Sequence, residues 1–179
     1  MSSEKMLTPH SFQGMIAEVI PPWLQAVVDS VNSLGIFPDG RHANHVLLNE
    51  YKPGQGIMPH LDGDLFFPAI TTVSLGSHTV LNFYEPMSEE DEESVDSSFD
   101  ARKKFSVLVE PRSLLVLRGE MYHKYLHGIE EVAEDKADEN LICPGGDRAE
   151  GSSLTRETRI SLTIRHVPKT SKMKLKLGR

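Results

Sequence analysis

Residues 69–84 read AITTVSLGSHTVLNFY and decide the fold class. The stretch contains two runs rich in β-branched and aromatic residues, Ala69–Leu75 and His78–Tyr84, separated by the turn-forming pair Gly76-Ser77. Runs of this kind, bounded by turn residues, are typical of β-strands. The stretch therefore predicts two strands with a short turn between them.

Four further runs of the same type lie on either side of this stretch. They are Asn44–Tyr51, Phe105–Val109, Ser113–Arg118 and Arg159–Val167. Turn residues separate them, as at Pro53–Gly56 and Glu110-Pro111. Six short strands at close spacing predict a mainly β protein with a sandwich or an open barrel as its core.

One convincing helix is predicted before the strands. Its apolar residues follow Pro21-Pro22, repeat with the spacing of one helix face and stop at Gly35; they are Leu24, Val27, Val28, Val31 and Leu34. The chain of 179 residues has the length of one domain. We expect a poorly specified leader over residues 1–20, the domain over residues 21–167 and a basic tail over residues 168–179.

Two acidic segments interrupt the β pattern. Glu85–Asp100 and Glu130–Glu150 hold eight acidic residues each, against no basic residue in the first and two in the second. Repelling charges with few apolar anchors cannot offset the entropy cost of ordering, so we expect two flexible, solvated loop insertions. The lysine-rich tail is expected to be a solubilising terminus, with nuclear targeting or phosphate contact as the alternative.

The net charge of −7, taken alone, argues against a nucleic-acid-binding protein. The two acidic segments produce this value, because the rest of the chain carries 17 basic and 10 acidic residues. A polyanionic partner is therefore not excluded. With 39% hydrophobic and 25% charged residues, the composition does exclude collagen-like, fully disordered and membrane classes.

Cys143 is the only cysteine, which excludes an internal disulfide and a cysteine-based zinc cluster and favours a reducing compartment. No apolar run reaches the roughly 18 residues of a membrane-spanning helix, and the first residues lack the apolar core of a secretory signal. We expect a monomer without membrane or disulfide-linked partners, located in the cytoplasm and nucleus.

The pair His60-x-Asp62 is the densest chemical signal. In an extended segment residues i and i+2 project to the same face, so an imidazole and a carboxylate can converge on one ion there. Two histidines and one carboxylate leave open positions on Fe(II) for a co-substrate and O₂. For the third ligand we favour His127, because the neighbouring Gly128 permits close backbone approach. His123 is the alternative, and spacing alone does not separate the two.

Two further patterns indicate a pocket for a short dianion. The run Arg159–Arg165 alternates, placing both arginines with Ser161 and Thr163 on one face and three apolar residues on the other. Two guanidinium groups at its ends can bracket a dicarboxylate, although a solvent-facing edge strand is the alternative. Asn49 and Tyr51 form a second i, i+2 pair that can donate hydrogen bonds to it, unless Tyr51 is a core residue.

In chain order, Asn49-x-Tyr51, His60-x-Asp62, His127 and Arg159-x5-Arg165 resemble the AlkB family of Fe(II)- and 2-oxoglutarate-dependent dioxygenases. Longer strings such as residues 45–49, 56–60, 74–81 and 126–129 resemble an animal branch of that family. The resemblance extends from about Pro21 to Arg165, outside the two acidic segments.

The resemblance implies a double-stranded β-helix, or jelly-roll, in which His60, Asp62 and His127 hold Fe(II). It implies that 2-oxoglutarate chelates the metal while Arg159 binds its distal carboxylate and Asn49 and Tyr51 assist. Arg165 is expected at the metal end, near the other carboxylate of 2-oxoglutarate or near Asp62. Ser161 stands where some members of the family have Asn. The implied reaction hydroxylates a C–H bond with O₂, often on an N-methyl group of a DNA or RNA base that is then lost as formaldehyde.

The chain also departs from this family. Members normally carry a longer N-terminal part with a substrate lid, whereas 48 residues precede Asn49 here, so we expect a shortened N-terminus with an incomplete lid. Phe66, Phe67 and Tyr84 are candidate platforms for stacking a base, with core packing as the alternative for the two phenylalanines. A protein or small-molecule substrate, or a catalytically silent binding module, are the alternative functions.

Overall fold

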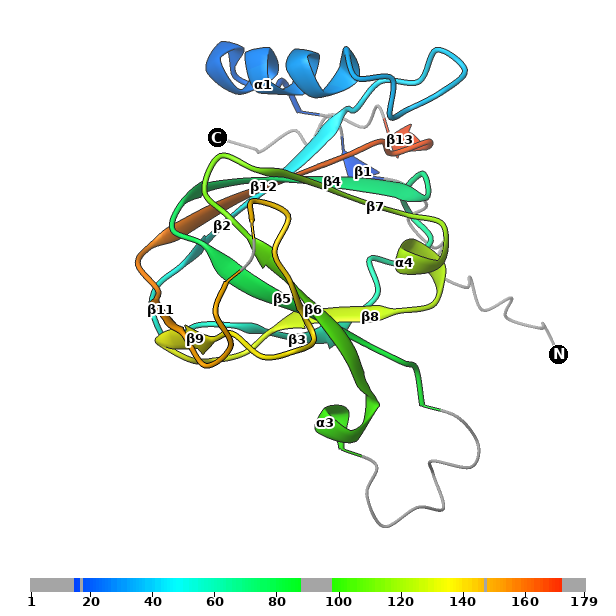
Figure 1. The fold of residues 1–179 in the computed structure, drawn as a ribbon. Helices are drawn as coiled ribbons and strands as arrows, with labels where there is room; N and C mark the ends of the chain where they lie inside the picture. Colours follow the sequence, from blue (N-terminus) through cyan, green and yellow to red (C-terminus); the bar gives the residue numbers. More distant parts are fainter. Residues whose placement is uncertain (1–14, 17, 88–97, 147, 172–179) are drawn as a thin grey trace, which may run out of the picture.

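Two β-sheets face each other in the computed structural model, which describes residues 15–16, 18–87, 98–146 and 148–171 (Figure 1). One sheet has the strand order β2-β12-β4-β7, formed by His45–Tyr51, Arg159–Arg165, Ala69–Gly76 and Leu114–Arg118. The other has the order β10-β6-β5-β8-β3, formed by Leu141–Ile142, Lys103–Val109, Thr79–Tyr84, Leu126–Ile129 and Ile57–His60. The predicted mainly β, jelly-roll class is confirmed.

Strand β12 lies inside the first sheet, and its two faces have different surroundings. It pairs antiparallel with β2 on one side and with β4 on the other. Its apolar face packs against helix α1 (Pro22–Asn32), which covers the outside of the sheet (Figure 1). Leu162 and Ile164 meet Leu24, Val28 and Val31 of the helix there. The opposite face of β12 is turned to the space between the sheets.

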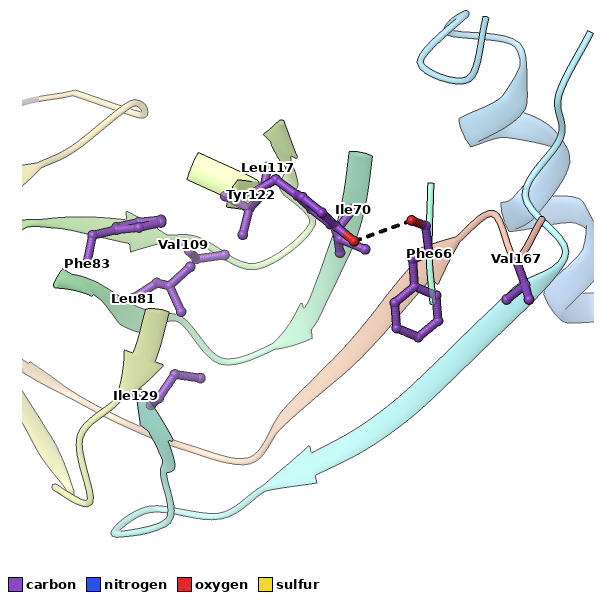
Figure 2. Packing of buried hydrophobic residues seen from close by; sticks show 9 residues of the cluster. All are labelled: Phe66, Ile70, Leu81, Phe83, Val109, Leu117, Tyr122, Ile129 and Val167. Atoms are coloured by element: carbon purple, nitrogen blue, oxygen red, sulfur yellow. Dashed lines mark hydrogen bonds between the residues drawn. The ribbon is translucent and has the colours of Figure 1, made fainter. Parts of the chain in front are cut away.

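A second hydrophobic core fills part of the space between the two sheets (Figure 2). Its side chains come from both sheets, from the loop before β4 and from the short helix α4 (Glu120–His123). They are Phe66, Ile70, Leu81, Phe83, Val109, Leu117, Tyr122, Ile129 and Val167. This core holds the two sheets together, and several of its side chains also line a cavity between them.

The six predicted strands are present, with ends within two residues of those expected, and the predicted helix is α1. The sequence did not indicate two short helices, α3 (Phe99–Arg102) and α4. It also missed the pairing strands β3 and β8, which are too short to show a run of their own. No helix among the described residues is long and apolar enough to cross a membrane.

The expectation of a flexible second acidic insertion was wrong. Residues 130–150 contain β10 and also β9 (Glu134–Lys136), which pairs with β11 (Ser153–Thr155). Asp135 is buried and accepts two hydrogen bonds from the buried Arg156, at 2.7 and 2.6 Å. His78 Nε2 lies 3.2 Å from the same carboxylate. Pairing with a basic side chain therefore orders this segment despite its net charge.

The leader and the tail are also partly ordered. Met15–Ile16 form β1 and pair in parallel with β13 (Thr170–Ser171). Met15 packs against the core between the sheets, so this part of the predicted leader takes part in the fold. Residues 1–14 and 17, most of the first acidic segment (88–97) and the lysine-rich end (172–179) lie outside the described residues.

Candidate metal centre

A cavity of about 80 Å³ opens between the two sheets, beside the shared core. That is several times the roughly 10–15 Å³ that one water molecule requires, so the space can hold a small ligand. Both sheets contribute side chains to its wall. All seven residues predicted for the site line it: Asn49, Tyr51, His60, Asp62, His127, Arg159 and Arg165.

His60, Asp62 and His127 meet at one end of this cavity. Each offers one potential ligand atom, and the three atoms lie within 4.8 Å of one another. Strands β3 and β8 place the two histidines opposite each other, because His60 and His127 are partners in the antiparallel register. Their ring centroids are 4.6 Å apart, and His127 Nε2 lies 3.6 Å from Asp62 Oδ2.

Gly128 allows this close approach of the two strands. A side chain added at residue 128 would meet the backbone nitrogen of Pro59 at 2.9 Å and the carbonyl oxygen of Ile57 at 3.0 Å. Any larger residue would therefore push β8 away from β3. The glycine keeps His127 within reach of His60.

The surroundings of the two other donors orient them toward a shared point. The His60 ring places Nδ1 2.8 Å from the carbonyl oxygen of Met58. If Nδ1 carries the proton, it donates to that carbonyl and leaves Nε2 with a lone pair for a metal. Asp62 accepts a hydrogen bond from Arg165 Nη2, which fixes one carboxylate oxygen.

His127 is held in its neutral form. Burial, together with smaller effects of His60 and Arg165, lowers its pKa to about 4, although Asp62 opposes the shift. A neutral imidazole is the form that binds a metal. His123 lies on α4, with its ring against that of Tyr122, and outside the group of three. The geometry thus separates two histidines that sequence spacing left open.

Arg159 lies at the other end of strand β12 and presents unused donors. Its Nε and Nη2 donate to the buried Ser74 hydroxyl at 3.3 and 2.8 Å, whereas its Nη1 is buried without a partner among the described residues. Burial lowers its pKa to about 10, so the guanidinium stays charged at neutral pH. A buried cation with a free N–H group is suited to an anionic ligand.

Tyr51 and Asn49 flank Arg159, as the pairing of β2 with β12 requires. Tyr51 is the register partner of Arg159, and Asn49 is the partner of Ser161. The Arg159 guanidinium carbon lies 5.5 Å from the Tyr51 ring centroid, and Asn49 Nδ2 donates to the Tyr51 hydroxyl at 3.4 Å. These two residues and Arg159 form one polar end of the cavity.

The three aromatic residues considered as stacking platforms have other positions. Phe66 belongs to the buried core between the sheets, and Phe67 packs against the hydrophobic cluster between α1 and the first sheet. Tyr84 is also buried, with its ring 5.7 Å from that of Phe99, so the expectation that it could stack on a base was wrong. Its position on the central strand β5 removes it from the surface.

Sequence reasoning missed two residues that support the site. Ser74 is fully buried and orients Arg159, but a serine within a strand run carries no signal of its own. Tyr122 donates to the loop that follows Asp62, a contact between segments that are far apart in the sequence. Only the three-dimensional arrangement identifies these contacts.

The donor set fits a particular metal chemistry. Two imidazoles and one carboxylate on one side of an ion leave its other positions open, and this is how non-haem Fe(II) oxygenases bind their metal. The unpaired Arg159 Nη1 and Arg165 Nε in the same cavity fit a bound anion. Fold and site together define a β-sandwich oxygenase of this class.

Comparison with protein families leads to the same class of oxygenase and identifies its superfamily. The model of the 2OG-Fe(II) oxygenase superfamily matches residues 3–165, so the chain belongs to this superfamily. It is accordingly a dioxygenase that uses Fe(II), 2-oxoglutarate and O₂, as the sequence motifs predicted.

Individual relatives place the chain in the AlkB family, which confirms the family predicted from the motifs. It is 46% identical over 168 residues to the zebrafish (Danio rerio) protein named "Probable RNA/DNA demethylase ALKBH6", covering 93% of this chain and 71% of the relative. Protein L905 of Acanthamoeba polyphaga mimivirus is 32% identical over 127 residues, covering 70% of this chain and 49% of that protein. The tRNA (carboxymethyluridine(34)-5-O)-methyltransferase alkbh8 of Xenopus tropicalis is 30% identical over 129 residues, 69% of this chain and 18% of that protein.

Proposed function

We propose that this chain removes methyl groups oxidatively from nucleic-acid bases, with Fe(II) held by His60, Asp62 and His127. The observation that carries the proposal is the shared cavity, which is lined by the three donors and by Arg159, whose buried Nη1 has no partner among the described residues. The zebrafish relative is named for demethylation of RNA or DNA, and the Xenopus relative for an activity on tRNA. Both names favour a nucleic-acid substrate here.

In this proposal each residue has a defined task. Bound iron and 2-oxoglutarate supply the oxidising power that hydroxylates a substrate C–H bond. Arg159 binds the distal carboxylate of 2-oxoglutarate through Nη1 and the second N–H of Nη2, because Ser74 occupies the remaining donor positions. Tyr51 and Asn49 add polar contacts at that end, and Arg165 keeps the Asp62 carboxylate oriented.

The wall of the cavity excludes bulk water from the reacting atoms. Apolar side chains from both sheets surround the polar ends, among them Leu81, Val109, Leu117 and Ile129. A dry pocket strengthens the charge interactions of Arg159 and prevents side reactions of a strong oxidant. The proposal further includes a monomeric enzyme in the cytoplasm and nucleus.

The decisive experiment supplies the iron-loaded protein with 2-oxoglutarate and two matched substrate panels. One panel holds methylated RNA and DNA oligonucleotides, and the other holds peptides with N-methylated lysine or arginine. We expect at least one oligonucleotide to release formaldehyde in step with succinate. Formaldehyde from peptides alone would assign a protein substrate, and an absence of succinate under every condition would indicate a silent binding module.

Replacing Arg159 with lysine tests the proposed co-substrate contact. Lysine keeps the charge but loses the forked donor geometry that a carboxylate prefers. We expect the KM for 2-oxoglutarate to rise about tenfold to a hundredfold, because a charge-assisted hydrogen bond contributes about 1.5–3 kcal/mol. Steady-state succinate formation measures the change. Arg148→Lys, at an exposed ion pair with Glu110, is the matched control and should leave KM unchanged.

A further inference from the structure

The hydroxyl of Tyr122 ties two separate parts of the metal centre together. Tyr122 lies on α4 and is only 7% exposed. Its hydroxyl donates to the carbonyl oxygen of Gly63 at 2.6 Å. The carbonyl oxygen of Phe66 lies 3.4 Å from the same hydroxyl, as the dashed line in Figure 2 marks. A buried phenol normally has a hydrogen-bond partner, and here that partner belongs to the loop that carries Asp62.

The bonded loop carries one proposed metal ligand and the segment after α4 carries another. Gly63 directly follows Asp62 and has a φ of +81°, a left-handed turn that glycine adopts readily. Helix α4 leads within a few residues into β8, which holds His127. The Tyr122 hydroxyl therefore joins the Asp62 loop to the His127 segment.

A second set of contacts closes the arrangement around Asp62. The Arg165 guanidinium carbon lies 4.4 Å from the Phe66 ring centroid, and Arg165 donates to the Asp62 carboxylate. The loop is thus held at the Asp62 side chain by Arg165 and at the Gly63 backbone by Tyr122. Burial raises the pKa of Tyr122, and the charges of Asp62 and Asp64 raise it further, so its hydroxyl remains a donor.

We infer that Tyr122 is a positioning residue for the metal centre, holding the Asp62 loop so that its carboxylate stays aligned with His127. The inference rests on the proposed role of Asp62 as a ligand. Outer contacts of this kind typically change metal affinity by about tenfold to a hundredfold when they are removed. Tyr122→Phe removes the hydroxyl and keeps the ring in its packed position.

The test compares Tyr122→Phe with Tyr125→Phe, a tyrosine on the same segment whose ring packs against Phe105. Anaerobic Fe(II) titration in the presence of 2-oxoglutarate measures metal affinity, and denaturant unfolding measures stability. We expect Tyr122→Phe to weaken Fe(II) binding about tenfold or more, while the KM for 2-oxoglutarate at saturating Fe(II) stays within about twofold. Tyr125→Phe should leave both constants unchanged.

Three other outcomes would overturn the inference. Wild-type Fe(II) affinity in Tyr122→Phe would show that the hydroxyl does not position the site. If Fe(II) affinity and the KM for 2-oxoglutarate both worsen in proportion to the unfolded fraction, Tyr122 has a merely structural role. Failure of the wild-type protein itself to bind Fe(II) would reject the proposed function, and the role of Tyr122 with it.

Discussion

Replacing His60 with alanine is expected to abolish the weak visible absorption band that the wild-type protein develops with Fe(II) and 2-oxoglutarate under anaerobic conditions. His60 supplies one of three donors that lie within 4.8 Å of one another, and the structure describes no fourth donor in that group to take its place. Removing outer contacts of a metal site already costs about tenfold to a hundredfold. Loss of a direct ligand should therefore lower succinate formation by more than about a hundredfold.

His123→Ala is the matched control for this experiment. His123 lies four residues before His127 in the chain, but its ring packs beside Tyr122 outside the group of donors. The band and the turnover of this variant should match those of the wild type. A band that persists in His60→Ala, or disappears in His123→Ala, would contradict the proposed ligand set.

Asp135→Ala is expected to lower the free energy of unfolding by about 3–5 kcal/mol, because it leaves a buried arginine without its partner. Asp135 and Arg156 have side chains that are only 5% exposed, and two hydrogen bonds join them. Arg156 also donates to the carbonyl oxygen of Glu130 at 2.8 Å, so the pair fastens the segment that contains β9 to the residues before β12. Urea denaturation followed by circular dichroism measures the loss.

An exposed ion pair provides the comparison for Asp135→Ala. Glu110 and Arg148 approach to 2.9 Å, but their side chains are 34% and 41% exposed. Glu110→Ala should therefore cost less than about 1 kcal/mol. Equal losses in the two variants would show that burial does not strengthen the Asp135–Arg156 pair.

The contribution of Asp135 to the stability of the fold should decrease at acidic pH. Burial alone would raise the pKa of Asp135, but hydrogen bonds from Arg156 and the nearby His78 imidazole more than offset this, and the pKa lies below its usual value of about 3.9. The contribution to stability is therefore fully present above about pH 4 and is lost as the pH falls through the lowered pKa. Asp135→Ala should lack this part of the acid sensitivity.

The sequence predicted those parts of the site that follow from local periodicity. The alternation of Arg159–Arg165 placed both arginines on one face, and the structure puts that face in the cavity. The spacing of His60 and Asp62 likewise predicted two donors on one side. The first prediction succeeds because strand geometry alone determines which side chains share a face. Asp62 lies in the loop after β3, where Arg165 bonds its carboxylate.

Contacts between distant segments could not be predicted in this way. The choice between His123 and His127 depends on how β8 pairs with β3, and four residues of spacing do not determine it. The ordered structure within residues 130–150 depends on the bond between Asp135 and Arg156, and Arg156 lies outside that segment. Charge patterns reveal repulsion within a segment, but they do not reveal a buried partner supplied from elsewhere in the chain.

The central position of β12 has a consequence for the choice of co-substrate. The strand is hydrogen-bonded on both sides, so Arg159 and Arg165 cannot move apart or together without breaking two ladders. Arg165 is bonded to the carboxylate at the metal end, and Arg159 points a free N–H into the opposite end. In the proposed function, 2-oxoglutarate is bound by Arg159 at one end and by iron beside Asp62 at the other. The backbone of a single strand would then hold Arg159 and the arginine that orients Asp62 at a fixed separation, which would favour a co-substrate of one length.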